Sequence, residues 1–130
     1  MKRINLKLAL LLKSKGINIQ ATHGYGRRPN INKNEWFLCQ NNDRGTPGKW
    51  TGKDSVSAPL LIEVVEYFRK RKGITIFVVT KSIAETHGFP DFKDIKGKFV
   101  SFYKINNIVS YFVARDYNSA IIKAILDILQ

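Results

Sequence analysis

Two strand-like segments, residues 98–105 and 108–115, are separated by only Asn106 and Asn107. Asparagine tolerates the positive φ angles that a two-residue hairpin turn requires, so this part of the chain predicts an antiparallel hairpin. A hairpin alone is marginally stable in water. Other elements of the chain must therefore pack against it.

The remaining elements follow from hydrophobic spacing and from the residues that end helices and strands. The expected segments are a helix over 5–15, strands over 17–22 and 36–40, a helix over 57–72, a strand over 74–80 and a last helix starting at Asp116 or Asn118. The order α-β-β-α-β-β-β-α predicts an α+β fold in which an antiparallel sheet packs against two to three helices. We expect a single domain over 1–130, with a basic α-β-β opening, 1–53, before an α-β-β-β-α portion, 57–130.

Positive charge is concentrated near the start of the sequence. The formal net charge is +12, and residues 1–53 contain eleven Lys and Arg but only two acidic residues, a net charge of +9. Such asymmetry favours a polyanionic partner, and nucleic acid, DNA or RNA, is the commonest one. The alternative is that Lys and Asn merely reflect an AT-rich genome and an ordinary solvated surface.

The sequence also indicates where the protein resides. Its longest early apolar run, Leu8–Leu12, is far shorter than the roughly 20 residues of a membrane-spanning helix. It also lacks the small-residue cleavage pattern of a secretory signal. Cys39 is the single cysteine, so an internal disulfide is excluded and a reducing compartment is compatible. We expect a cytoplasmic protein with no membrane partner.

The hairpin register gives the first candidate binding surface. Pairing Ile105 with Ile108 places Phe102 opposite Tyr111. The basic residues expected on the same face are Lys98, Lys104 and Arg115. Two aromatic rings flanked by cations can stack single-stranded bases and hold phosphates. The alternative is that helices cover this face, although the opposite face has the better core set, Phe99, Ile105, Ile108 and Phe112.

A second candidate surface lies in two expected loops of the basic opening. Residues 23–28 join an aromatic ring to two guanidinium groups on a glycine-containing backbone that can approach a ligand closely. Residues 49–53 repeat the combination of aromatic and basic side chains. The candidate contacts to nucleic acid are Tyr25, Arg27, Arg28, Lys33, Lys49, Trp50 and Lys53. The alternative is two solvated loops whose rings pack locally. The basic run 69–72 has the same two readings, because cations also complement the C-terminal end of a helix dipole.

An enzymatic alternative rests on the polar residues of segment 82–97. These are Glu85, His87, Asp91, Asp94 and Lys96, which could ligate a divalent metal for phosphodiester cleavage. Metal-dependent nucleases with similar letters present their acids from neighbouring strands, whereas here the acids lie in one expected loop. Residues 45–51 also fail the spacing of a phosphate-binding loop. The sequence therefore favours a non-enzymatic domain with no metal and no cofactor.

A third class of function is a structural or protein-interaction module, such as a virion component or an inhibitor that binds an acidic protein surface. The last helix favours it, because Ile122, Leu126 and Leu129 make that helix apolar nearly all round. A helix of this kind is either deeply buried or part of a homodimer contact.

Two resemblances add to this reading. The order helix, three strands, helix over 57–130 is similar to the double-stranded RNA-binding fold, although the last helix opens with 116–119, Asp-Tyr-Asn-Ser, where that family places phosphate-binding lysines. The same stretch resembles small uncharacterised proteins of Bacteroidetes phages and prophages through Ala58-Pro59-Leu60-Leu61, Tyr67-Phe68-Arg69-Lys70 and Gly73-Ile74-Thr75-Ile76. This resemblance implies a phage or mobile-element accessory protein, acting in the host cytoplasm, and transfers no active site.

Overall fold

The structure is a computed structural model that describes residues 2–40, 48, 50, 52–86 and 97–130. The chain divides into two compact units, Met1–Val64 and Val65–Gln130, and the division falls within one helix. In chain order the elements are α1 (Leu6–Ser14), β1 (His23–Arg28), α2 (Pro29–Asn32), β2 (Lys33–Gln40), β3 (Ser55–Ser57), α3 (Leu61–Tyr67), the π-helix η1 (Phe68–Lys72), β4 (Phe77–Thr80), α4 (Lys81–Thr86), β5 (Phe99–Ile105), β6 (Ile108–Ala114) and α5 (Tyr117–Ile128).

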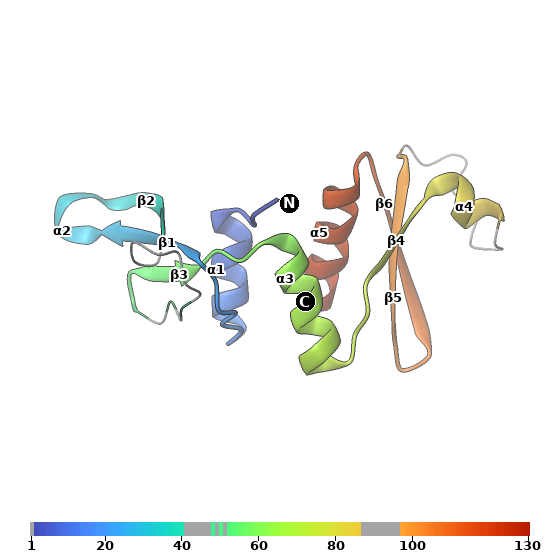
Figure 1. The fold of residues 1–130 in the computed structure, drawn as a ribbon, viewed down its shortest axis with the longest axis horizontal. Helices are drawn as coiled ribbons and strands as arrows, with labels where there is room; N and C mark the ends of the chain where they lie inside the picture. Colours follow the sequence, from blue (N-terminus) through green and yellow to red (C-terminus); the bar gives the residue numbers. More distant parts are fainter. Residues whose placement is uncertain (1, 41–47, 49, 51, 87–96) are drawn as a thin grey trace. The chain divides into compact units, whose positions relative to one another are not determined.

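The strands form two antiparallel three-stranded sheets, β2-β1-β3 in the first unit and β4-β5-β6 in the second (Figure 1). Together with the helices they confirm the predicted α+β class. No helix in the described part of the chain is long and apolar enough to span a membrane.

The first unit is built around β1, the central strand of its sheet. β1 pairs with β2 over 23–27 and with β3 over 24–26. Helix α1 contacts β3 and buries Leu8, Ala9 and Leu12. The Tyr25 hydroxyl donates a hydrogen bond of 2.8 Å to the backbone oxygen of Ile4, which ties β1 to the segment that precedes α1.

The first strand does not lie where the sequence predicts it. Residues 17–20 form no strand, and the predicted loop 23–28 is β1 itself. Alternating apolar residues suggested a strand at 17–22, and Ile17 and Ala21 are indeed buried. Within the described part of the chain, however, this segment pairs through one isolated bridge at Ala21 and not along a strand. Glycines argued against a strand at 23–28, yet a glycine inside a strand often marks a close approach by another group.

Both predicted helix ends at glycine are confirmed. Gly16 and Gly73 adopt positive φ angles of 74° and 66°, which glycine reaches at little cost. The predicted helix start at Ser57 is wrong, because Ser57 belongs to β3 and donates its hydroxyl to the Ile19 oxygen. Helix α3 starts at Leu61 instead, where the Glu63 carboxylate accepts the Leu60 N–H at 2.8 Å.

The second unit contains the predicted hairpin. The pairs Ile105–Ile108 and Phe102–Tyr111 confirm its register, and Asn106 and Asn107 have φ angles of 51° and 65°. Strand β4 adds a third strand to the side of β5. The predicted loop 82–97 begins within helix α4, and its residues 87–96 lie outside the described part of the chain.

Helix α5 covers one face of this sheet, as Figure 1 shows. The Ser101 hydroxyl donates to the Ala120 oxygen at 2.6 Å, and the Tyr103 hydroxyl donates to the Asp127 carboxylate. Burial, reinforced by the hydrogen bond to Asp127, raises the pKa of Tyr103 above its usual range. This face is therefore the core of the second unit.

The predicted core set on this face is partly wrong. Ile105 and Ile108 are 38% and 70% exposed because they flank the hairpin turn, whereas α5 covers Ser101 and Tyr103. In α5 itself Ile121, Ala124 and Ile125 are buried, and Ile128 is half-buried. Leu129, named above for a dimer contact, is only 5% exposed, so burial within the chain accounts for that residue.

The start of α5 gives a first testable prediction. Asp116 caps the helix by accepting the Ser119 N–H at 2.8 Å. Replacing it by Ala leaves the first turn of the helix without its side-chain acceptor, so we expect Asp116→Ala to lower the free energy of unfolding by about 1 kcal/mol. Urea denaturation measures this loss. Asp116→Ser, which keeps a capping oxygen, should retain most of the stability; equal losses in the two variants would contradict the capping role.

Candidate nucleic-acid interface

Three aromatic rings form a row across the second sheet. The pairs Phe77–Phe102 and Phe102–Tyr111 place one ring on each strand and all three on the same face. The ring centres of Phe77 and Phe102 are 5.1 Å apart with nearly parallel planes, and those of Phe102 and Tyr111 are 6.1 Å apart. We call Phe77, Phe102 and Tyr111 the aromatic row.

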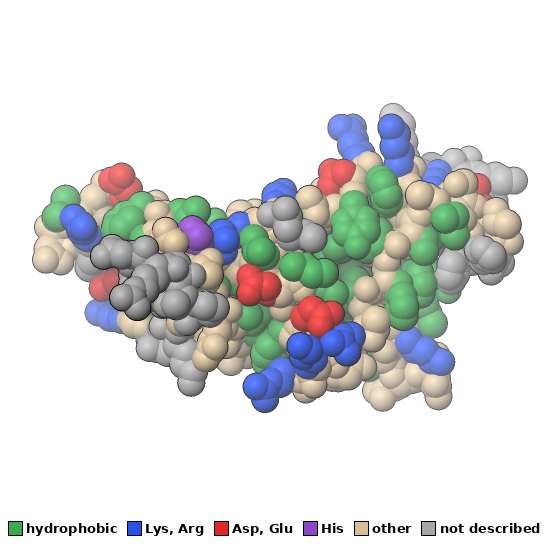
Figure 2. Space-filling model, viewed as in Figure 1, with side chains coloured by type: hydrophobic (Ala, Val, Ile, Leu, Met, Phe, Trp, Pro, Cys, Tyr) green, Lys and Arg blue, Asp and Glu red, His purple; other side chains and the backbone are tan. Residues whose placement is uncertain are grey.

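Among the described elements, α4 packs on the face that carries the aromatic row, at one end of it. Ala84 of α4 forms a buried cluster with Val100 and Val113, and Figure 1 shows α4 on the side of the sheet opposite to α5, away from the β5–β6 turn. Towards the turn, Phe77 is 51% exposed and Val109 is 38% exposed. Figure 2 shows hydrophobic side chains at the surface over β4 and β5. The open end of this face is thus apolar and aromatic.

The predicted basic residues of the hairpin occupy two different ends of this face. Lys104 pairs with Val109 next to the aromatic row and is exposed. Lys98 and Arg115 are also exposed, but they lie beyond the paired strands at the end that α4 covers, where the Lys98 N–H donates to the Ala114 oxygen. Of these three basic residues, Lys104 is the one that lies beside the aromatic row.

The predicted cluster in the first unit is used mainly inside the fold. Arg27 Nε donates to the Asp54 carboxylate at 2.8 Å, and Arg27 Cζ lies 4.8 Å from the centre of the Trp36 ring. The indole N–H of Trp50 donates to the Ala21 oxygen at 3.1 Å, and its ring lies against Gly24. Together with the hydrogen bond from Tyr25 to Ile4, these contacts give Arg27, Trp50 and Tyr25 structural roles within the first unit.

The other predicted residues of this cluster are dispersed. Arg28 is exposed at the end of β1, where its Cζ lies 5.7 Å from the centre of the Phe37 ring, and Lys53 is exposed before β3. Lys33 opens β2, but its side chain falls outside what the structure describes, as does all of Lys49. The basic loop predicted at 23–28 is instead a strand, which pairs with β2 along one edge and with β3 along the other.

The metal-dependent nuclease hypothesis falls largely on residues that are not described. Glu85 is exposed on α4, whereas His87, Asp91, Asp94 and Lys96 lie outside the described residues. Among the residues placed in the structure, no group of three His, Cys, Asp or Glu side chains could hold a metal ion.

Burial raises the pKa of Cys39, whose thiol donates to the Gly24 oxygen, so this thiol is disfavoured as a nucleophile.

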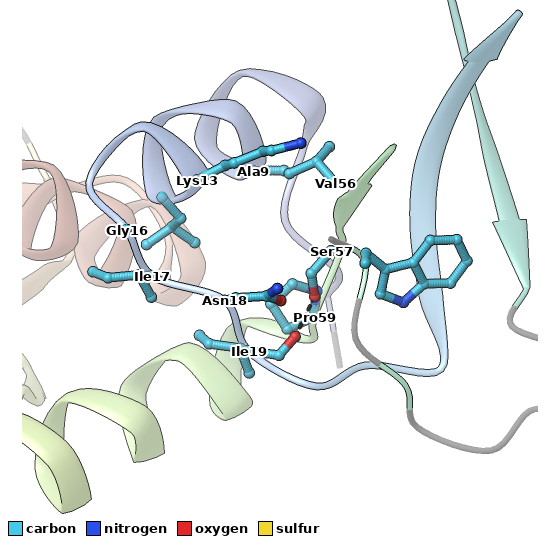
Figure 3. A pocket seen from close by; sticks show the side chains of 11 residues that line it. Ala9, Lys13, Gly16, Ile17, Asn18, Ile19, Val56, Ser57 and Pro59 are labelled. Atoms are coloured by element: carbon cyan, nitrogen blue, oxygen red, sulfur yellow. Dashed lines mark hydrogen bonds between the residues drawn. The ribbon is translucent and has the colours of Figure 1, made fainter. Parts of the chain in front are cut away.

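A small pocket in the first unit does not suit a nucleotide. It measures about 210 Å³ and lies between α1, residues 16–19 and β3 (Figure 3). Two of its polar side chains are already engaged, since the Lys13 ammonium donates to the Gly52 and Ser55 oxygens at 2.7 Å and Ser57 donates to Ile19. Ligand pockets usually exceed roughly 300 Å³ and present convergent polar groups.

Phe77 is the site residue that sequence reasoning missed. The strand over 74–80 was predicted, but its partner was not, because the segment 81–98 separates it from β5 and local turn chemistry does not fix such a register. The available signal was a shared alternation. In β4, Phe77 and Val79 alternate with Val78 and Thr80, and in β5, Phe102 and Val100 lie on either side of Ser101 in the same way.

Comparisons of the chain with protein-family models, with curated proteins and with solved structures gave no match.

Proposed function

We propose that this protein is a non-enzymatic domain that binds single-stranded nucleic acid on the open face of its second sheet. Bases stack on the aromatic row, and phosphates are bound by Lys104 and by the general positive charge. The observation that carries the proposal is the row itself, three rings in register on one sheet face with Phe77 half exposed beside an exposed cation.

The chemistry of the row favours single strands over duplexes. Every base has a π-face, so stacking on aromatic side chains is sequence-tolerant, and the base faces are accessible only when the strand is unpaired. The described residues offer no array of polar side chains around the row that would read base edges. Little sequence preference is therefore expected, and DNA and RNA are both candidate ligands.

The test is fluorescence anisotropy of labelled single- and double-stranded DNA and RNA with purified protein over a range of salt. The proposal predicts tighter binding of single strands and a steep fall of affinity with salt. Polyglutamate of matched charge is the control, because it presents a polyanion without bases. Equal affinity for polyglutamate and for the oligonucleotides would contradict stacking, and absence of oligonucleotide binding at low salt would refute the proposal.

The same titration addresses a second candidate function, binding of an acidic protein. Exposed apolar side chains in the first unit favour it: Ile31, Phe37 and Leu38 are 77%, 40% and 50% exposed, and Arg28 lies over Phe37. Exposed apolar groups on the outer strand of a sheet are typical of a protein contact. Preference for polyglutamate over oligonucleotides would support this function instead.

Lys104 yields a prediction specific to phosphate binding. Replacing Lys104 by Gln removes one cation beside the aromatic row, so the slope of log affinity against log salt should decrease in magnitude by about 0.7 for a single strand. Lys7→Gln is the matched control, because Lys7 is also exposed but lies on α1 of the first unit. A Lys104 variant whose salt slope equals that of the control would remove this residue from the site.

A further inference from the structure

Four consecutive cations of the second unit lie outside the aromatic row and are distinct from Lys104. They are Arg69, Lys70, Arg71 and Lys72 of η1, and all four are exposed, whereas Phe68 at the start of η1 is 1% exposed. We call these four residues the basic turn. A π-helix closes its hydrogen bonds over five residues and is frequently found at functional sites. Figure 2 shows Lys and Arg side chains gathered over this end of the helix.

The basic turn is only partly neutralised. The Glu66 carboxylate accepts from Arg69 Nη2 at 2.7 Å and lies 3.9 Å from Lys70 Nζ. The hydrogen bond from Arg69 lowers the pKa of Glu66, which keeps that carboxylate ionised. In the described part of the chain neither Arg71 nor Lys72 has an acidic partner. Complementing the helix dipole accounts for a cation or two near the helix end, but does not require four exposed ones.

The position of the basic turn relates it to the aromatic row. Lys72 and Phe77 are five residues apart, and all peptide bonds between them are trans, so their Cα atoms lie within about 18 Å of each other. Phe77 is the ring at the β4 end of the row, and β4 is the strand that the chain enters on leaving the basic turn. A single strand stacked on the row and leaving it at β4 would therefore reach these cations within a few nucleotides.

We propose that the basic turn binds the backbone phosphates of the same single strand whose bases stack on the aromatic row, so that the binding site extends past the edge of β4. This inference rests on the proposed function and adds to it a second contact region and a minimum ligand length. Long oligonucleotides occupy both regions, whereas short ones occupy the row alone.

The test compares two oligonucleotide lengths, about four and about sixteen nucleotides, which bracket the usual site sizes of single-strand-binding folds. The variant is Arg71→Gln with Lys72→Gln. It should bind the short oligomer as the unaltered protein does. For the long oligomer its salt slope should decrease in magnitude by about 1.4, the value expected for two lost phosphate contacts.

The matched control is Lys2→Gln with Lys7→Gln, which removes the same charge from exposed positions of the first unit. A loss in the control equal to that in the variant would overturn the inference, because it would reflect net charge alone. Unchanged binding of the long oligomer by the basic-turn variant would also overturn it, while leaving the proposed function standing. Failure of the unaltered protein to bind either oligomer would instead refute the proposed function.

Discussion

Replacing Phe77 by Ala is expected to weaken the binding of a single-stranded oligonucleotide by roughly five- to 150-fold, the equivalent of about 1–3 kcal/mol for one stacked base. Phe77 is half exposed and forms the β4 end of the aromatic row, where it stacks on Phe102 at 5.1 Å. The substitution removes both the outermost ring and its support of Phe102. Anisotropy at a fixed low salt concentration measures the change.

The control for this prediction is Ile108→Ala. Ile108 is 70% exposed on β6 and pairs with Ile105, whose side chain lies on the face opposite to the aromatic row. This variant therefore removes apolar surface from the same sheet without touching the proposed site, and its affinity should not change. Equal losses in the two variants would point to general destabilisation. An unaltered Kd in the Phe77 variant would exclude stacking at this position.

Replacing Gly24 by Ala is expected to lower the free energy of unfolding by about 1–3 kcal/mol, the usual cost of overpacking. A Cβ at Gly24 would lie 2.3 Å from Trp50 Cδ2 and 2.4 Å from Trp50 Cε3, so the indole would have to move. That movement would also disturb the hydrogen bond from the indole to Ala21. Chemical denaturation followed by tryptophan fluorescence measures the loss.

Gly26 offers a control for Gly24 in the same strand and on the same face. A Cβ at Gly26 would meet Cys39 Sγ at 3.6 Å, an ordinary van der Waals distance. Gly26→Ala should therefore leave stability unchanged or raise it slightly, because alanine restricts the unfolded chain. Comparable losses in the Gly24 and Gly26 variants would contradict the idea that the packing of Trp50 requires a residue without a Cβ at position 24.

The hairpin shows why some of the fold could be predicted from sequence. Its register depends on two adjacent asparagines and on the alternation of flanking residues, all of which are local. The glycine helix ends are equally local and were also predicted correctly, whereas the start of the last helix was left open between Asp116 and Asn118. The division of the strands between two sheets was not predicted, because it depends on pairings between segments distant in the sequence.

The candidate site was predicted only where it rests on the hairpin. Phe102 facing Tyr111 follows from the local register, whereas Phe77 joins them through a pairing across segment 81–98. In the first unit, sequence gave no means of knowing that Trp50 would pack on Gly24 or that Arg27 would bond to Asp54. Aromatic and basic side chains in a glycine-rich segment have the same composition whether they serve a ligand or their own fold.

Single-stranded nucleic acid is proposed to bind on the aromatic row of the second unit. The most direct measurement is ultraviolet crosslinking of the protein to a thymidine- or uridine-rich single strand, followed by mass spectrometry of the crosslinked peptides. Crosslinks are expected at Phe77, Phe102 or Tyr111, with fewer in the Phe77→Ala variant. Crosslinks confined to Tyr25, Trp36 or Trp50 of the first unit would contradict it.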